Sequence, residues 1–164
     1  MEYYIKERNE ESLLRGFWGK GKVNMYGFKS LKEMTENEVK MMKKARDLYE
    51  YIPEIIEYDS DNKRLIVTKV DGENIDKYIR RTKDLGIIDK LEEGFSKLQK
   101  KKIVIDNEQG YIMNYDYHPG NFMVDKNKNI WFVDWDISGL GQDHNLIDDK
   151  NDRNEFKEFL RTLV

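Results

Sequence analysis

Two neighbouring stretches decide the fold: Asn114-Tyr115-Asp116-Tyr117-His118-Pro119-Gly120-Asn121-Phe122-Met123-Val124 and, after a polar turn, Ile130-Trp131-Phe132-Val133-Asp134-Trp135-Asp136. Asn121 follows Asp116 by five residues, and Asp134 ends an apolar, strand-like run. Pro119-Gly120 is suitable turn chemistry for bringing Asp116 and Asn121 together. Carboxylate and amide oxygens are the ligands that Mg²⁺ takes, and a further carboxylate orients an acceptor hydroxyl in phosphoryl transfer. The pattern therefore predicts a phosphoryl-transfer site.

A plainer interpretation treats residues 111–124 as a hairpin closed by a Pro-Gly turn. Either stretch alone is compatible with that purely structural role. The order and the separation of the two stretches together favour the phosphoryl-transfer site.

Length and charge exclude several classes of protein. A chain of 164 residues suggests one domain, or two small lobes that share a core. Lys and Arg number 29 against 32 Asp and Glu, a net charge of −3, which gives no support to a nucleic-acid partner or to binding of anionic membranes. No apolar run approaches the roughly 18 residues of a membrane span.

The absence of cysteine excludes disulfides, thiolate catalysis and cysteine-based zinc sites. It fits a reducing cytosol, so we expect a cytoplasmic protein, or one delivered to a host cytosol if it is an effector.

The hydrophobic periodicity predicts an α+β protein. The expected helices are one that opens with a capping box at Thr35–Glu38 and stops at Pro53, a short one from about Asn74, one over 87–101 and a closing one over 152–163. The expected strands are several short ones in 3–28, a pair at 55–59 and 64–70, and others near 111–114, 121–124 and 130–134.

The opening stretch resembles the catalytic loop of the protein-kinase-like superfamily. It is most similar to the aminoglycoside/choline phosphotransferase and lipopolysaccharide-kinase style, in which an Asp-x-His-Pro-x-Asn run is usual. Residues 132–136 resemble the segment that reads Asp-Phe-Gly in protein kinases. The resemblance implies that Asp116 is the catalytic base, Asn121 a metal ligand and Asp134 the main metal ligand.

The resemblance covers residues 12–136 and implies a bilobal fold. A small β-rich lobe would span 1–68 and a truncated helical lobe 69–164, with ATP and Mg²⁺, or Mn²⁺, between them. Most of the helical subdomain that docks substrates in larger kinases has no counterpart in the sequence.

The resemblance also implies a set of nucleotide-binding residues. Residues 65–75 match the last strand of the small lobe and the hinge, which places Val67 at the gatekeeper position and the backbone of Thr68 and Val70 against adenine. Glu38 matches the helix glutamate that holds the phosphate-binding lysine, although it is also the fourth residue of the expected capping box.

A glycine-rich segment is the expected cover over the phosphates. It contains Gly16, Gly19 and Gly21, with Trp18 in place of the usual middle glycine. Lys29 is the candidate for the phosphate-contacting lysine, and Lys22 and Lys32 are alternatives.

Two departures from the family pattern stand beside the catalytic loop. Asn114 replaces the usual histidine, and Tyr115 stands where many protein kinases have an arginine that binds an activating phosphate. We expect an ATP- and Mg²⁺-dependent phosphotransferase that acts on a hydroxyl of a protein or small molecule, with an activating protein partner left open. The alternatives are a nucleotide-binding pseudokinase or scaffold, and nucleotidyl transfer with ATP reversed.

Overall fold

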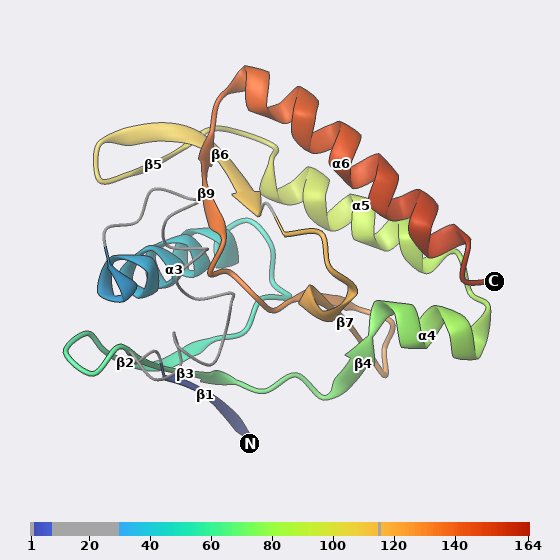
Figure 1. Ribbon diagram of the computed structural model, residues 1–164, viewed down its shortest axis with the longest axis horizontal. Coiled ribbons are helices and arrows are strands. Elements are labelled where there is room, and N and C mark those ends of the chain that lie inside the picture. The colour runs from blue at the N-terminus through green and yellow to red at the C-terminus, as the bar shows by residue number, and fades with distance from the viewer. Residues whose placement is uncertain (1, 8–29, 115) are drawn as a thin grey trace.

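The structure, a computed structural model, describes residues 2–7, 30–114 and 116–164 (Figure 1). Its helices and strands are, in chain order, β1 (Tyr3–Glu7), α3 (Leu31–Arg46), β2 (Ile55–Asp59), β3 (Arg64–Thr68), β4 (Gly72–Asn74), α4 (Ile75–Thr82), α5 (Ile87–Leu98), β5 (Ile103–Ile105), β6 (Glu108–Asn114), the 3₁₀ turn η1 (Pro119–Asn121), β7 (Phe122–Asp125), β8 (Ile130–Phe132), β9 (Ser138–Gly141) and α6 (Asp143–Arg161).

The first sheet has the strand order β1-β3-β2 and is antiparallel throughout. In its central strand, buried Leu65 and Val67 alternate with half-buried Ile66, the period of two that a strand with one covered face requires. The register places Tyr4 opposite Val67 and Lys6 opposite Leu65. The expected pairing of the strands at 55–59 and 64–70 is thus confirmed, although β3 ends at Thr68 and not at residue 70.

Helix α3 lies between this sheet and the β5–β6 hairpin (Figure 1). Ser30 caps its N-terminus, because the Ser30 side chain accepts a hydrogen bond from the Glu33 amide at 3.1 Å. The capping box expected at Thr35–Glu38 is therefore wrong, because both residues are buried inside the helix. Ser30 and Glu33 carry the same Ser/Thr-x-x-Glu signature five residues earlier, and the chain uses that one.

The predicted catalytic stretch runs between two other sheets rather than forming a hairpin. Strand β6 pairs with β5 and β9, whereas β7 pairs with β4 and β8. The residues between β6 and β7 therefore cross from one sheet to the other, so the plainer hairpin interpretation is wrong.

An aromatic cluster fills the core beneath these sheets. Phe95 of α5 lies 5.0 Å from Phe132 and 5.7 Å from Phe122, measured between ring centroids. Gly94 permits this close packing, because a Cβ at that position would lie 2.9 Å from the Phe132 ring. The cluster fixes β7 and β8, the strands that flank the predicted metal-binding residues.

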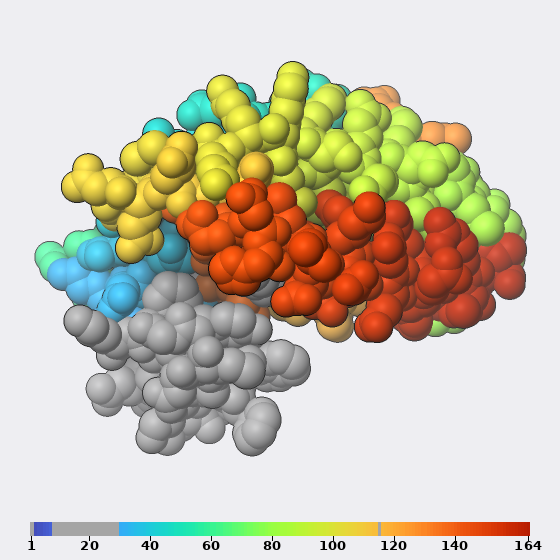
Figure 2. All heavy atoms as spheres, turned by 90° about the horizontal axis from the view of Figure 1, so that it is seen from above, coloured from blue at the N-terminus to red at the C-terminus, as the bar shows by residue number. Residues whose placement is uncertain are grey.

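Helix α6 runs alongside α5 across one face of the molecule (Figure 2). Glu92 of α5 joins them, with its Oε2 3.0 Å from Lys157 Nζ and 3.7 Å from Arg153 Nε. The helix begins at Asp143, nine residues before the expected start at 152. The sequence did not indicate these first turns, because residues 143–151 are mostly polar and carry no apolar stripe.

The α+β class is confirmed, and the architecture of small sheets and helices is compatible with a compact kinase-like fold. None of the helices in the described ranges is both long and apolar enough to cross a membrane. The division into lobes at residues 68 and 69 remains a prediction.

Candidate functional site

A cavity of about 280 Å³ lies between the first sheet and the segments around β7. Five residues predicted from the sequence line it, namely Val67, Thr68, Val70, Asn121 and Asp134. Its other lining residues are Tyr4, Lys6, Pro53, Lys69, Gly120, Met123 and Val133. Residues from β1, β3, η1, β7 and the segment after β8 thus meet at one hollow.

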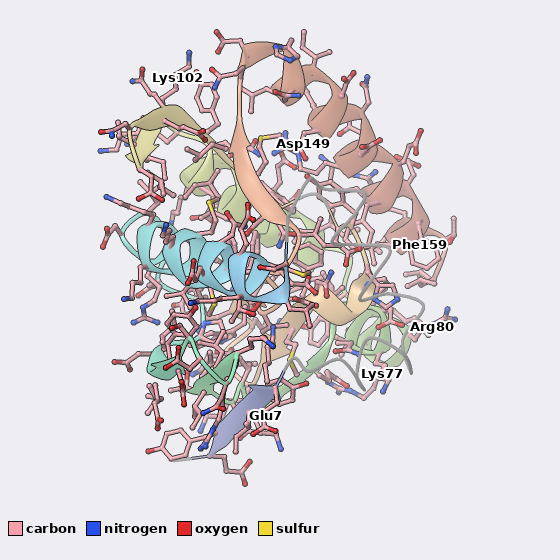
Figure 3. The ribbon with its side chains drawn as sticks, turned by 60° about the vertical axis from the view of Figure 1, so that its left-hand side comes forward. Glu7, Lys77, Arg80, Lys102, Asp149 and Phe159 are labelled. Atoms are coloured by element: carbon pink, nitrogen blue, oxygen red, sulfur yellow. The ribbon has the colours of Figure 1, made fainter. Side chains whose placement is uncertain are left out.

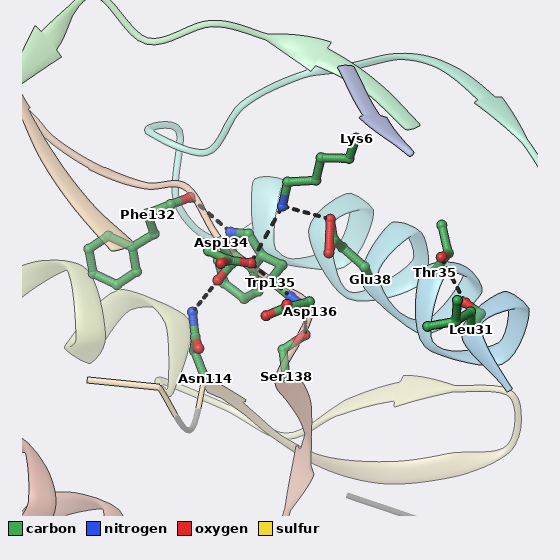
Figure 4. Close-up of polar contacts among 10 residues, drawn as sticks. All are labelled: Lys6, Leu31, Thr35, Glu38, Asn114, Phe132, Asp134, Trp135, Asp136 and Ser138. Carbon is green, nitrogen blue, oxygen red and sulfur yellow. Dashed lines mark hydrogen bonds and ion pairs between the residues drawn. The ribbon is translucent and has the colours of Figure 1, made fainter. Parts of the chain in front are cut away.

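Lys6 of β1 links the first sheet to the rest of the site (Figure 4). Its Nζ lies 3.0 Å from Oε1 of Glu38 and 3.4 Å from Oδ1 of Asp134. The Glu38 side chain is fully buried in α3, whereas that of Asp134 is 31% exposed. A single ammonium group therefore lies next to one buried carboxylate and one that opens toward the cavity.

The expected contact between a lysine and Glu38 is present, but the lysine is Lys6, a residue that the sequence reasoning missed. The predicted lysine, Lys29, lies outside the described residues, as do its alternative Lys22 and Gly16, Gly19 and Gly21. The other alternative, Lys32, is an exposed residue of α3 and does not line the cavity.

The loop between β6 and β7 bends back as the sequence suggested. The Asn121 side chain donates from Nδ2 to the Asp116 carbonyl at 3.0 Å, and the Asn121 carbonyl accepts from the Val133 amide at 3.0 Å. His118 supports the turn, because its Nδ1 accepts a hydrogen bond from the Gly120 amide at 3.0 Å. Asn121 thus ties the loop of Asp116 to the segment of Asp134.

Asn114 holds the Asp134 segment from the other side. Its buried Nδ2 donates to the Asp134 carbonyl at 2.9 Å (Figure 4). The Asp136 amide donates to Asp134 Oδ1 at 3.3 Å, and the Trp135 indole donates to the Phe132 carbonyl at 2.8 Å. The backbone around Asp134 is therefore fixed before any ligand arrives, which is the preorganisation that an electrostatic site needs.

Helix α6 anchors the same loop through Tyr117. Asp149 is buried on the side of α6 that faces the rest of the molecule (Figure 3), and it accepts a hydrogen bond from the Tyr117 hydroxyl. The other carboxylate oxygen of Asp149 accepts from Gln99 Nε2 at 3.0 Å. Burial and then the charge of Asp149 raise the pKa of the Tyr117 phenol far above its usual range, so this hydroxyl remains a donor.

The oxygen donors at this site fit magnesium better than zinc. Asp134 contributes a carboxylate and Asn121 an amide, whereas the described residues contain no cluster of three His, Cys, Asp or Glu side chains. Mg²⁺ is commonly held by one or two carboxylates together with substrate phosphates, so a sparse protein ligand set suits it. The Lys6 ammonium beside Asp134 adds positive charge where phosphate groups would lie.

Residues 30–149 match the family described as the ABC1 atypical kinase-like domain. The chain belongs to this family. The ABC1 match confirms the resemblance to the protein-kinase-like superfamily, and it includes Glu38, Val67, Asn121 and Asp134. It extends into α6, beyond residue 136, where the resemblance was expected to end.

A longer protein is also similar to this chain in sequence. The chain is 26% identical over 174 residues to a probable bifunctional tRNA threonylcarbamoyladenosine biosynthesis protein of Methanosphaera stadtmanae. The alignment covers 98% of this ABC1-family chain and 30% of the relative, so the chain spans less than a third of that protein's length.

The cavity predicts a contrast between two adjacent residues of β3. Val67 is buried and lines the cavity, so Val67→Phe should overpack it and weaken ATP binding on the order of tenfold, as an oversized core side chain costs about 1–3 kcal/mol. Thr68→Ala should lower the melting temperature slightly, because the Thr68 hydroxyl accepts from the Glu54 amide at 3.0 Å, but ATP affinity should hardly change. Calorimetry below both melting temperatures checks this, and equal losses of affinity would contradict the hinge assignment.

Proposed function

We propose that the protein is an ATP- and Mg²⁺-dependent phosphotransferase that moves the γ-phosphate of ATP to a hydroxyl of a protein or small molecule. The observation that carries the proposal is the position of Lys6 Nζ, 3.0 Å from Glu38 and 3.4 Å from Asp134, at a cavity that Asn121 also lines. A lysine held by a helix glutamate beside a metal-binding aspartate is the arrangement by which kinases hold the phosphates of ATP.

The nucleobase would bind at the hinge end of the cavity through backbone groups. The Thr68 amide already donates to the Glu54 carbonyl at 2.9 Å, and the Lys69 amide donates to the Glu2 carbonyl at 3.0 Å. The Thr68 carbonyl and the backbone of Val70, the groups expected from the sequence, would recognise adenine.

Asp116 does not itself line the cavity, but its carbonyl is bound by Asn121, which does. From there Asp116 would orient the acceptor hydroxyl and take its proton. The acceptor oxygen forms a bond to the γ-phosphorus while the bond from that phosphorus to the β,γ-bridging oxygen breaks, and ADP leaves. Lys6 neutralises charge on the phosphates, and Asn121 keeps the Asp116 loop next to the Asp134 segment.

Asp134 and Asn121 would hold the metal. Mg²⁺, or Mn²⁺, held there would supply positive charge that stabilises the phosphates of ATP. Asn114 and the Asp136 amide would keep the Asp134 carboxylate in the orientation that this role needs.

The proposed architecture places ATP between a small lobe, residues 1–68, and a trimmed helical lobe, residues 69–164. An activating protein partner that supplies a docking surface for the acceptor is also part of the proposal. We propose that the protein works in the cytoplasm, which the cysteine-free sequence fits.

Metal dependence of ATP binding tests the proposal. With Mg²⁺ present, Asp134→Asn should weaken ATP binding by about 10–100-fold, because the change removes one negative ligand charge from the metal site. In excess chelator, wild type and variant should bind ATP equally weakly. Asp106→Asn is the control, since Asp106 lies in the exposed turn between β5 and β6 and pairs with Lys40.

Isothermal titration calorimetry gives both affinities, and ATP turnover is measured in parallel. Binding of ATP that a chelator leaves unchanged would contradict the metal assignment. Metal-independent binding without turnover would favour the pseudokinase.

A further inference from the structure

We infer that Tyr4 is the residue that stacks on the nucleobase and gives the site a preference for purines over pyrimidines. The inference rests on the proposed function, because it concerns the nucleotide that the same cavity would bind. Tyr4 was not among the residues that the sequence pattern indicated.

The direction of the Tyr4 side chain follows from the alternation of β1. Residues two apart in a strand point to the same face, so Tyr4 and Lys6 share a face while Tyr3 and Ile5 share the other. Lys6 reaches Glu38 and Asp134 from β1, which identifies its face as the one toward the site (Figure 4). Tyr4 and Lys6 both line the cavity, in agreement with this geometry.

The position of Tyr4 along the strand places it over the base rather than the phosphates. Two residues of strand span roughly 7 Å. From Lys6, that step leads toward the hinge, because Lys6 pairs with Leu65 whereas Tyr4 pairs with Val67. Tyr4 therefore lies at the end of the cavity where Thr68 and Val70 would meet adenine.

The segments around β7 also contribute apolar side chains to the lining of the cavity. Met123 of β7 and Val133, which follows β8, belong to that lining, whereas Tyr4 and Val67 come from the first sheet. A flat nucleobase inserted between the first sheet and the segments around β7 would contact apolar atoms on one face and the phenol ring of Tyr4 on the other. Base stacking on an aromatic side chain tolerates any base but grows with the area of overlap, so a purine gains more than a pyrimidine.

The phenol ring has surface available for this contact. Tyr4 is 53% exposed, and Tyr3, its neighbour on the opposite face, is also 53% exposed. Tyr3 does not line the cavity. The strand thus offers a matched pair: the same side chain and the same exposure on the same strand, but only one of the two at the cavity.

The experiment measures binding of MgATP, MgCTP and magnesium tripolyphosphate to the full chain by calorimetry. Tyr4→Ala should weaken ATP binding about tenfold and CTP binding clearly less, so that the ratio of the two affinities falls. Tyr4→Phe, which keeps the ring, and Tyr3→Ala should both stay within about twofold of wild type. Tripolyphosphate has no base, so its affinity should be the same in all four proteins.

Other outcomes overturn the inference at distinct points. If Tyr4→Ala and Tyr3→Ala weaken ATP equally, or if tripolyphosphate affinity falls together with ATP affinity, Tyr4 acts through the strand or through Lys6 and not on the base. An unchanged ATP-to-CTP ratio in Tyr4→Ala overturns the purine preference. Failure of wild type to bind any nucleotide overturns the proposed function and this inference with it, whereas the first three results leave the proposed function standing.

Discussion

Asp116→Asn should slow phosphoryl transfer by about 10²–10⁴-fold, a barrier increase of about 3–5 kcal/mol. The amide cannot take the proton of the acceptor hydroxyl. ATP affinity and melting temperature should hardly change, because the contact that holds the loop uses the backbone carbonyl of Asp116, which accepts from Asn121 at 3.0 Å. Single-turnover kinetics with labelled ATP and a host-cell extract as the source of acceptor would measure the effect.

Asp125→Asn is the matched control for this change. Asp125 closes the turn after β7, where its side chain accepts hydrogen bonds from the Asn127 and Asn129 amides and the Trp131 indole. Its replacement should lower the melting temperature and reduce turnover only in proportion to unfolding. If Asp116→Asn behaves in the same way, or retains full transfer activity, Asp116 is not the base.

Lys6→Met should reduce kcat on the order of 10²–10³-fold, the usual effect of removing one preorganised group that stabilises developing charge. The ammonium beside Asp134 disappears, so the phosphates lose a protein cation, and affinity for MgATP should fall as well. Glu38→Gln should reduce kcat less, because it leaves the lysine in place but weakens the ion pair that orients it.

Lys29→Met tests the lysine that was expected from the sequence, which lies outside the described residues. If Lys6 is the lysine that contacts the phosphates, kcat should be near normal for Lys29→Met. It should also be near normal for the control Lys40→Met, because Lys40 is an exposed residue of α3 that pairs with Asp106. Loss of activity in Lys29→Met together with a normal Lys6→Met would show that the contact of Lys6 with Glu38 and Asp134 is structural. Circular dichroism of each variant checks that the chain is folded.

The bend of the proposed catalytic loop could be predicted from the sequence because its determinants are local. Asp116, the Pro119-Gly120 turn and Asn121 lie within six residues, and the turn chemistry alone implies that the chain bends back there. The end of the strand at the proposed hinge could be predicted in the same way, because a β-branched run followed by Asp71-Gly72 indicates a strand that stops at a turn.

Lys6 could not be found in this way because Glu38 and Asp134, which it contacts, are distant from it in the sequence. Glu38 lies 32 residues away and Asp134 lies 128 residues away. The sequence reasoning placed the phosphate lysine after the glycine-rich segment, whereas Lys6 precedes it. One local signal was available: Lys6 is the only cation in the run Tyr3-Tyr4-Ile5-Lys6-Glu7, whose β-branched and aromatic residues favour a strand.

The errors in helix boundaries have a common physical origin. At α3 two capping signatures stood five residues apart, and tertiary packing, which buries Thr35 and Glu38, selected the earlier one. At α6 the buried face of the first turns includes Asp149, so hydrophobic periodicity could not reveal it. Glu38 of α3 matched a capping box but is buried beside Lys6, and Asp149 of α6 is buried where a sequence pattern would need an apolar residue. In both places a buried polar residue has a partner elsewhere in the fold that the local sequence does not show.

The site depends on how accurately one short strand is aligned. Among the strands of the described residues, β1 lies at the edge of its sheet and pairs with β3, yet it carries Lys6. A slip of one residue against β3 would move every side chain of β1 to the opposite face of the sheet. Lys6 would then face away, and Ile5 or the acidic Glu7 would point toward Asp134, replacing the attraction there by an apolar contact or by repulsion between like charges. The hydrogen bonds of the strand ladder oppose such a slip, and so does the hydrogen bond from the Lys69 amide to the Glu2 carbonyl. A backbone contact at one end of β1 therefore helps to keep the Lys6 ammonium next to Asp134 at the other end.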